Sequence, residues 1–249
     1  MSAFRLPQET CRRCNGQLSK YWWAGQDKEN RIHWISWSAI CQIKFTGGLG
    51  FRDFNRFNIG LLAKQAWRVL LNPSSHIARI YKARYHPVHD FLNASAGSRP
   101  SWAWQGVLEG RDLLKRGLRW QVGDGSQIWL LQDNWLPSSP PSCPKLRPGL
   151  HSFPSRISEL ICPNSHSWKK DLLVSLFMPE SVDLILAIPL PVSHSFDSLI
   201  WHYDSSGAYT VKSGYHLLSN EYNLITRRPY SLLIHGFGNC CGVWRSRQK

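Results

Sequence analysis

The chain has 249 residues, 43% of them hydrophobic, which is enough to bury a core in one or two domains. Its 30 Lys and Arg side chains outnumber 16 Asp and Glu, and the net charge of +14 favours a polyanionic partner over a merely solvated basic surface. Seven irregularly spaced cysteines argue against a secreted disulfide framework, and no apolar run reaches the ~20 residues that cross a bilayer. We therefore expect an intracellular protein, nuclear or cytoplasmic, with no membrane partner.

The first predicted helix lies within residues 4–23 and carries a Cys-x-x-Cys pair, Cys11 and Cys14. Because no second Cys/His pair at zinc-ligand spacing lies nearby, packing of both thiols on one helix face is favoured over a metal site. A polar turn is expected at residues 25–30, and helical spacing of aromatic and apolar residues predicts a second helix in residues 33–44.

The strongest helical pattern runs from Phe54 to Asn72 and follows a glycine-rich turn, residues 47–50. Asp53 stands where a helix N-terminus favours an acceptor and a negative charge. Such a turn can cradle a phosphate, but it is also a common way to start a helix, and we favour the second interpretation. Two further helices are predicted at residues 76–87, with Ile77, Ile80 and Tyr81 facing inward, and at residues 101–117, with Ser101 as N-cap.

These helices combine an apolar stripe with a basic flank. A region that grips nucleic acid needs this combination, because its cations neutralise successive phosphates without reading the sequence. A solvated basic surface would have the same pattern. The candidate phosphate contacts are Arg52, Arg56, Lys64, Arg68, Arg79, Lys82, Arg84, Arg111, Lys115 and Arg116.

The second half of the chain is predicted to be mixed. β-Prone runs flanking Gly123-Asp124-Gly125 predict a hairpin in residues 118–137, and alternation predicts a second hairpin in residues 197–212. Short helices are expected at residues 156–161, 168–178, 179–188 and 213–221. The fold class is therefore α+β, with a helical N-terminal half and a second half of short helices and two β-hairpins. We expect the divisions 1–136, a Pro/Ser-rich linker at 137–154, a small α+β region at 155–222 and a tail at 223–249.

Several motifs resemble one family. Gly-Gly-Leu-Gly-Phe-Arg-Asp (47–53) and Leu-Leu-Ala-Lys-Gln-Ala-Trp-Arg (61–68) look like the region after the polymerase core in plant LINE-type (non-LTR) retrotransposon reverse transcriptases. The similarity covers roughly residues 1–222. Its other motifs are Trp-Trp-x-Gly (22–25) with His-Trp-x-x-Trp (33–37), Asp-x-Trp-Leu-Pro (133–137), Asp-x-Leu-x-Trp (197–201) and Gly-x-Tyr-Thr-Val-Lys-Ser-Gly-Tyr (207–215).

The resemblance implies a thumb-like region that follows the polymerase palm and leads into the reverse-transcriptase zinc-binding domain, as in the ribonuclease H-like proteins of plants that share it. It also implies RNA or an RNA–DNA hybrid as partner, together with the missing palm domain, and makes Met1 an internal methionine of a longer protein. The match stops after residue 222. The expected Cys/His cluster is replaced by a tail with adjacent Cys240 and Cys241, which we expect to be disordered or frameshifted.

Polymerisation requires paired carboxylates that hold two metal ions, yet no two acidic residues are adjacent in this chain. We therefore expect no catalytic residue, no metal and no cofactor. Three hypotheses stay open. The chain is a catalytically inactive C-terminal fragment of such a reverse transcriptase, an independent nucleic-acid-binding or protein-interaction module derived from one, or an enzyme with an unrecognised site. The first is favoured.

Overall fold

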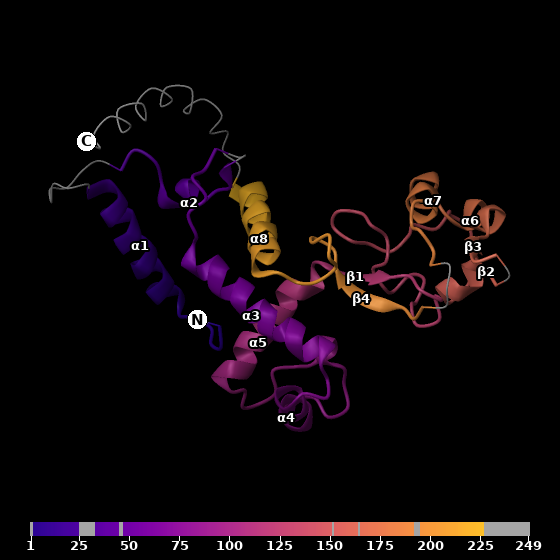
Figure 1. Cartoon of the computed structure of the whole chain (residues 1–249), viewed down its shortest axis with the longest axis horizontal. Coiled ribbons are helices and arrows are strands. Elements are labelled where there is room, and N and C mark those ends of the chain that lie inside the picture. The colour runs from indigo at the N-terminus through magenta and orange to yellow at the C-terminus, as the bar shows by residue number, and fades with distance from the viewer. Residues whose placement is uncertain are drawn as a thin grey trace, which may run out of the picture.

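The computed structural model describes residues 2–24, 33–44, 47–150, 152–163, 165–191 and 195–226 (Figure 1). Its elements are α1 (Gln8–Ala24), α2 (Trp37–Ile40), α3 (Phe54–Leu71), α4 (His76–Tyr85), η2 (Phe91–Asn93), α5 (Trp102–Lys115), β1 (Leu118–Gln121), η3 (Ile157–Leu160), β2 (Ile161–Cys162), β3 (Ser167–Trp168), α6 (Lys170–Leu176), α7 (Pro179–Leu186), β4 (Ser198–Trp201) and α8 (Val211–Thr226). This confirms the α+β class. The predicted tail lies outside the described residues from position 227 on, as does the turn predicted at 25–30.

Local sequence signals account for several helix starts. Asp53 caps α3, Ser75 caps α4 and Ser101 caps α5, each accepting a hydrogen bond from the backbone amide three residues on. Pro179 opens α7, where its fixed φ suits the first helical position. The second helix is shorter than predicted, because α2 contains only Trp37–Ile40.

A first apolar cluster forms where α3 packs against α5 and α8. Its fully buried members include Ala63, Trp104, Leu114, Trp201 and Tyr209. The approach of α3 and α5 depends on Gly110, since a Cβ there would lie 2.4 Å from the carbonyl carbon of Leu62. The helices therefore meet backbone to backbone (Figure 1).

The strands β1 and β4 form an antiparallel ribbon in which Leu118 pairs with Trp201 and Gln121 with Ser198. Both predicted hairpins are therefore wrong in their pairing: the first strand of one pairs with the first strand of the other. The residues that follow Gly125 form turns and isolated bridges, and the residues that follow β4 lead into α8.

A second apolar cluster is formed by residues between the two strands of the ribbon, from Val122 to Ile188. It includes the fully buried side chains of Trp135, Ile157, Phe177 and Ile185. The second cluster is thus inserted between β1 and β4, whereas the first cluster is built from both sides of the insertion.

The Pro/Ser-rich segment 137–154 contacts this second cluster. Leu146 and Leu150 pack against it, and the amide of Arg147 donates to the carbonyl of Leu176 at 2.9 Å. The division of the chain at this segment stays a prediction.

Candidate nucleic-acid interface

The glycine-rich turn before α3 uses its amides within the chain. The N–H groups of Gly47, Gly48, Leu49 and Gly50 all donate to carbonyls of residues 40–44, at 2.9 to 3.2 Å. Gly48 must be glycine, because a Cβ there would lie 2.1 Å from the carbonyl oxygen of Gln42. Since no amide of the turn points outward without a partner, the turn starts a helix and does not cradle a phosphate.

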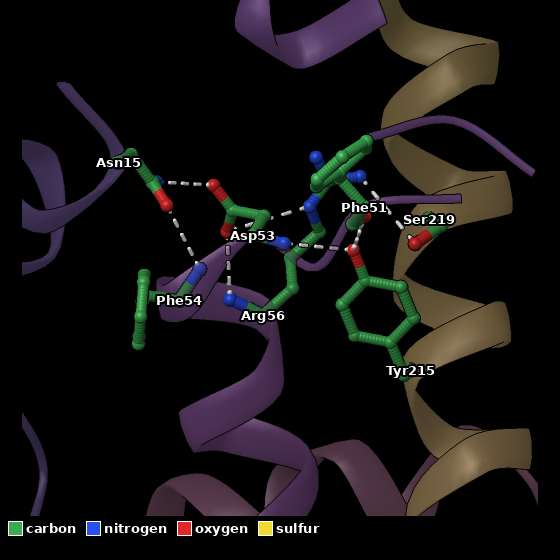
Figure 2. A network of polar contacts seen from close by, with 7 residues as sticks. All are labelled: Asn15, Phe51, Asp53, Phe54, Arg56, Tyr215 and Ser219. Atoms are coloured by element: carbon green, nitrogen blue, oxygen red, sulfur yellow. Dashed lines mark hydrogen bonds and ion pairs between the residues drawn. The ribbon is translucent and has the colours of Figure 1, made fainter. Parts of the chain in front are cut away.

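Asp53 is the centre of a polar network that joins α1, α3 and α8 (Figure 2). Its Oδ1 accepts the Arg56 amide at 2.9 Å, and its Oδ2 accepts the Asn15 side-chain amide at 2.7 Å. Its own amide donates to the hydroxyl of Tyr215 at 2.9 Å, and that hydroxyl donates to the carbonyl of Phe51 at 3.3 Å. The network fixes the start of α3 between two helices that are remote from it in sequence.

Arg56, one of the ten predicted phosphate contacts, belongs to this network. The residue is 8% exposed, and its Nε lies 3.5 Å from Asp53 Oδ1. Its Nη1 donates to Ser219 Oγ at 3.4 Å, and its guanidinium stands 4.8 Å from the centre of the Tyr222 ring. The prediction that Arg56 faces outward is wrong, because Asp53 and side chains of α8 enclose it.

Three other predicted cations are engaged inside the chain. Lys64 Nζ donates to the carbonyl of Tyr209 at 2.7 Å, where the chain enters α8. Arg111 donates to the carbonyl of Ala94 and to Asp112. Arg116 forms an ion pair with Glu221 at 2.7 Å. Apart from Arg116, whose side chain is half exposed, these groups hold elements together.

The remaining six predicted cations are exposed. Arg52 and Arg84 rest over the rings of Phe57 and Tyr85, at 4.8 and 5.6 Å. The side chains of the other four make no hydrogen bond or ion pair with the described part of the chain; they lie on α3, α4 and α5 and are Arg68, Arg79, Lys82 and Lys115. They are the side chains most available to a polyanion.

The outer face of α4 is apolar as well as basic. Ile77 and Ile80 are 58% and 61% exposed, so the prediction that they point inward is wrong. The inner face of this helix instead carries buried Ala78 and half-buried Tyr81 and Tyr85, and the two tyrosine rings pack against Trp104 at 5.0 and 4.8 Å between ring centres. Larger aromatic area on that face explains why it is the inner one.

Sequence reasoning missed two polar features. Asp197, 7% exposed, accepts the amides of Gly123, Gly125 and Gln127 and so ties the predicted turn to β4. Nothing local in the sequence indicates that contact. The second is a row on α8, Lys212 and His216, beside a polar pocket; their four-residue spacing on a helix is the signal that could have indicated it.

Among the residues described, no group of three or more His, Cys, Asp or Glu is placed to hold a metal ion. Cys11 is buried and Cys14 exposed, so the pair does not share a packed face. Burial raises the pKa of the Cys41 thiol to about 12, which keeps it protonated and unreactive. No helix in the described ranges is long and apolar enough to cross a membrane.

Comparison with known proteins gives two relatives. The chain is 38% identical over 147 residues, 58% of its length, to an "Uncharacterized mitochondrial protein" of Arabidopsis thaliana, of which it covers 94%. It is 25% identical over 255 aligned positions, 99% of its length, to a "Putative ribonuclease H protein" of the same plant. It spans only 39% of that second relative. No family model and no solved structure matches it.

Proposed function

This chain belongs to the family of the uncharacterized mitochondrial protein of Arabidopsis thaliana, and from that membership we propose that it is a retrotransposon-derived nucleic-acid-binding protein. In this proposal it is a catalytically inactive C-terminal fragment of a LINE-type reverse transcriptase, which keeps a basic surface for RNA or an RNA–DNA duplex. The motifs shared with that region of plant elements support the origin. The name of the second relative, a ribonuclease H protein, supports a nucleic-acid partner.

The observation that carries the binding proposal is the placement of the exposed cations. Arg68, Arg79, Lys82 and Lys115 come from three helices of one apolar cluster, and no acceptor in the described residues neutralises them. Fixed cations of this kind bind phosphates mainly by releasing counterions. Arg52, Arg84 and Arg116 are the other exposed candidates, whereas Arg56, Lys64 and Arg111 are engaged inside the chain.

Binding of the full chain to a labelled RNA–DNA hybrid, measured across a salt series, tests this proposal. The change Arg79→Gln with Lys82→Gln should reduce the slope of log affinity against log salt by about 0.9 for each phosphate that is no longer neutralised. The control is Lys145→Gln with Lys170→Gln, which removes the same charge from exposed positions in the part of the chain that forms the second cluster. Equal salt slopes for the Arg79/Lys82 pair and the control pair would refute phosphate binding by the exposed cations of the helices.

Absence of catalysis is tested separately. We expect neither primer extension nor hybrid cleavage with Mg²⁺ or Mn²⁺, because the carboxylate sets that hold two metal ions are missing from the sequence. Metal-dependent turnover by the purified chain would refute inactivity without affecting the binding proposal.

An independent binding module is the second candidate. It is favoured by one finding: the matched segment makes up 94% of the mitochondrial relative, so a comparable length of chain exists as a protein of its own. A folded chain that binds nucleic acid without any palm domain would support this candidate over a fragment that depends on its parent.

A further inference from the structure

A polar pocket of about 370 Å³ lies beside the start of α8. This volume is at the lower end of the range for small-molecule sites. None of its lining residues is among the ten cations predicted from the sequence. The lining includes Tyr203, Asp204, Lys212, His216, Leu217 and Asn220.

Three of these side chains form one row on α8. Lys212, His216 and Asn220 are four residues apart, so they lie on the same helix face about 6 Å from one another along the axis. None of the three makes a side-chain hydrogen bond or ion pair with the described part of the chain, whereas their neighbours Thr210 and Ser213 bond to each other at 2.8 Å. The row therefore presents unused donors and acceptors to the pocket.

The charge of the pocket is balanced. Hydrogen bonds from Ser206, and from Thr210, hold the pKa of Asp204 below its ordinary value, so the carboxylate is ionised and already engaged. Burial, together with the charge of Lys212, lowers the pKa of His216, so the imidazole is neutral at pH 7. One cation, one anion and a neutral imidazole do not favour a small multiply charged anion.

We propose that this pocket binds one nucleotide of a nucleic-acid strand, with its phosphate on Lys212 and its base edge on His216 and Asn220. An ammonium suits a single phosphodiester charge, and an amide can both donate to and accept from a base edge. The half-buried ring of Tyr203 and the side chain of Leu217 supply the apolar surface that a base face requires. This inference rests on the proposed nucleic-acid binding and locates one contact of it.

Fluorescence anisotropy of a labelled RNA pentanucleotide with the full chain tests the pocket. Asn220→Ala should weaken binding by about 5- to 100-fold, as expected for removal of a base-edge contact. Lys212→Gln should lower the salt slope by about 1. Gln105→Ala and Lys170→Gln are matched controls, exposed on α5 and α6, and should leave binding unchanged. Circular dichroism should report the same helix content for all four variants.

Competition distinguishes the sources of the ligand. A nucleotide pocket is supported if a nucleoside monophosphate competes with the pentanucleotide and this competition is lost in the Lys212→Gln and Asn220→Ala variants. Binding of the pentanucleotide about tenfold tighter than the monophosphate, or better, would indicate that the pocket takes a nucleotide of a strand. Inorganic phosphate competing as well as the monophosphate would overturn the inference in favour of a simple anion site. Unchanged binding by both α8 variants would overturn it too, whereas the proposed function is tested separately by the hybrid-binding experiment with the α4 variants.

Discussion

The carboxylate of Asp197 accepts a hydrogen bond from the amide of Gly123 at 2.7 Å, across 74 positions of the chain. The same oxygen accepts the amide of Gly125 at 2.9 Å, and the second oxygen accepts that of Gln127 at 2.9 Å. One buried side chain thus satisfies three backbone donors that no strand partner reaches. It fixes the turn after β1 against the start of β4.

Asp197→Ala should destabilise the chain by about 3 kcal/mol, because it leaves buried amides without an acceptor. Urea unfolding followed by circular dichroism measures the change. Asp183→Asn, on the exposed side of α7, is the control and should stay within about 0.5 kcal/mol of the native chain. A destabilisation below about 1 kcal/mol for Asp197→Ala would mean that water replaces the carboxylate.

Two glycine substitutions should change the stability of the chain in opposite directions. Gly110→Ala places a Cβ 2.4 Å from the backbone of Leu62 and should force α3 and α5 apart, at a cost of several kcal/mol. Gly16→Ala, within α1, meets no atom within 4 Å and should stabilise the chain by about 0.5–1 kcal/mol. Thermal melts of the two variants measure both effects. Similar melting shifts would contradict the close packing of α3 on α5.

Buried Arg56 and exposed Arg68 should separate stability from binding. Arg56→Gln removes the guanidinium contacts to Asp53 and Ser219 and should lower the urea midpoint. Arg68→Gln should leave the midpoint unchanged and lower only the salt slope of nucleic-acid binding. If Arg56→Gln affected only binding, the enclosure of this side chain by α8 would be wrong.

Two histidines should make stability depend on pH. Burial, followed by the charge of Arg119, lowers the pKa of His202, and burial with Lys212 lowers that of His216. The unfolded chain therefore binds more protons than the folded chain below about pH 6.5. The free energy of unfolding therefore falls as the pH decreases from about 6.5. Urea midpoints at pH 7.5 and 5.5 measure the decrease.

His202→Gln should flatten this dependence. The carboxyls of Asp124 and Asp204 do not account for it, because hydrogen bonds lower their pKa from an ordinary value of 3.8 and their effect belongs to more acidic solutions. A midpoint that stays constant from pH 7.5 to 5.5 would contradict the burial of both imidazoles.

The sequence predicts those features that depend on neighbouring residues. Asp53 and Ser101 can be identified as caps because a cap and its helix are adjacent, and both accept the predicted amide bonds. The strand partners of β1 and β4 cannot be found in this way. A turn signal such as Asp124-Gly125 favours local pairing, whereas the real partner of Leu118 is Trp201, beyond the whole second cluster.

The exposure of the predicted cations also depends on residues that are remote in the sequence. Arg56 and Arg68 each belong to an i,i+4 basic pair of the predicted pattern, and contacts with the remote α8 enclose the first whereas the second is exposed. On α4 the apolar pair Ile77 and Ile80 competes with Tyr81 and Tyr85 for the inner face, and the distant ring of Trp104 decides between them. The predicted set of phosphate contacts therefore mixes side chains that hold the fold together with side chains that are exposed.

The insertion of the second cluster between β1 and β4 has a consequence for translation. A ribosome delivers α3 and α5 early, but β4 and α8 emerge only after residues 122–190. Until then the face of α3 that α8 covers, including the Arg56 guanidinium, lacks that cover. A premature stop codon anywhere before residue 198 would remove both the strand that pairs with β1 and the helix that seals the first cluster, so a nonsense change late in the reading frame would unfold segments encoded far upstream of it.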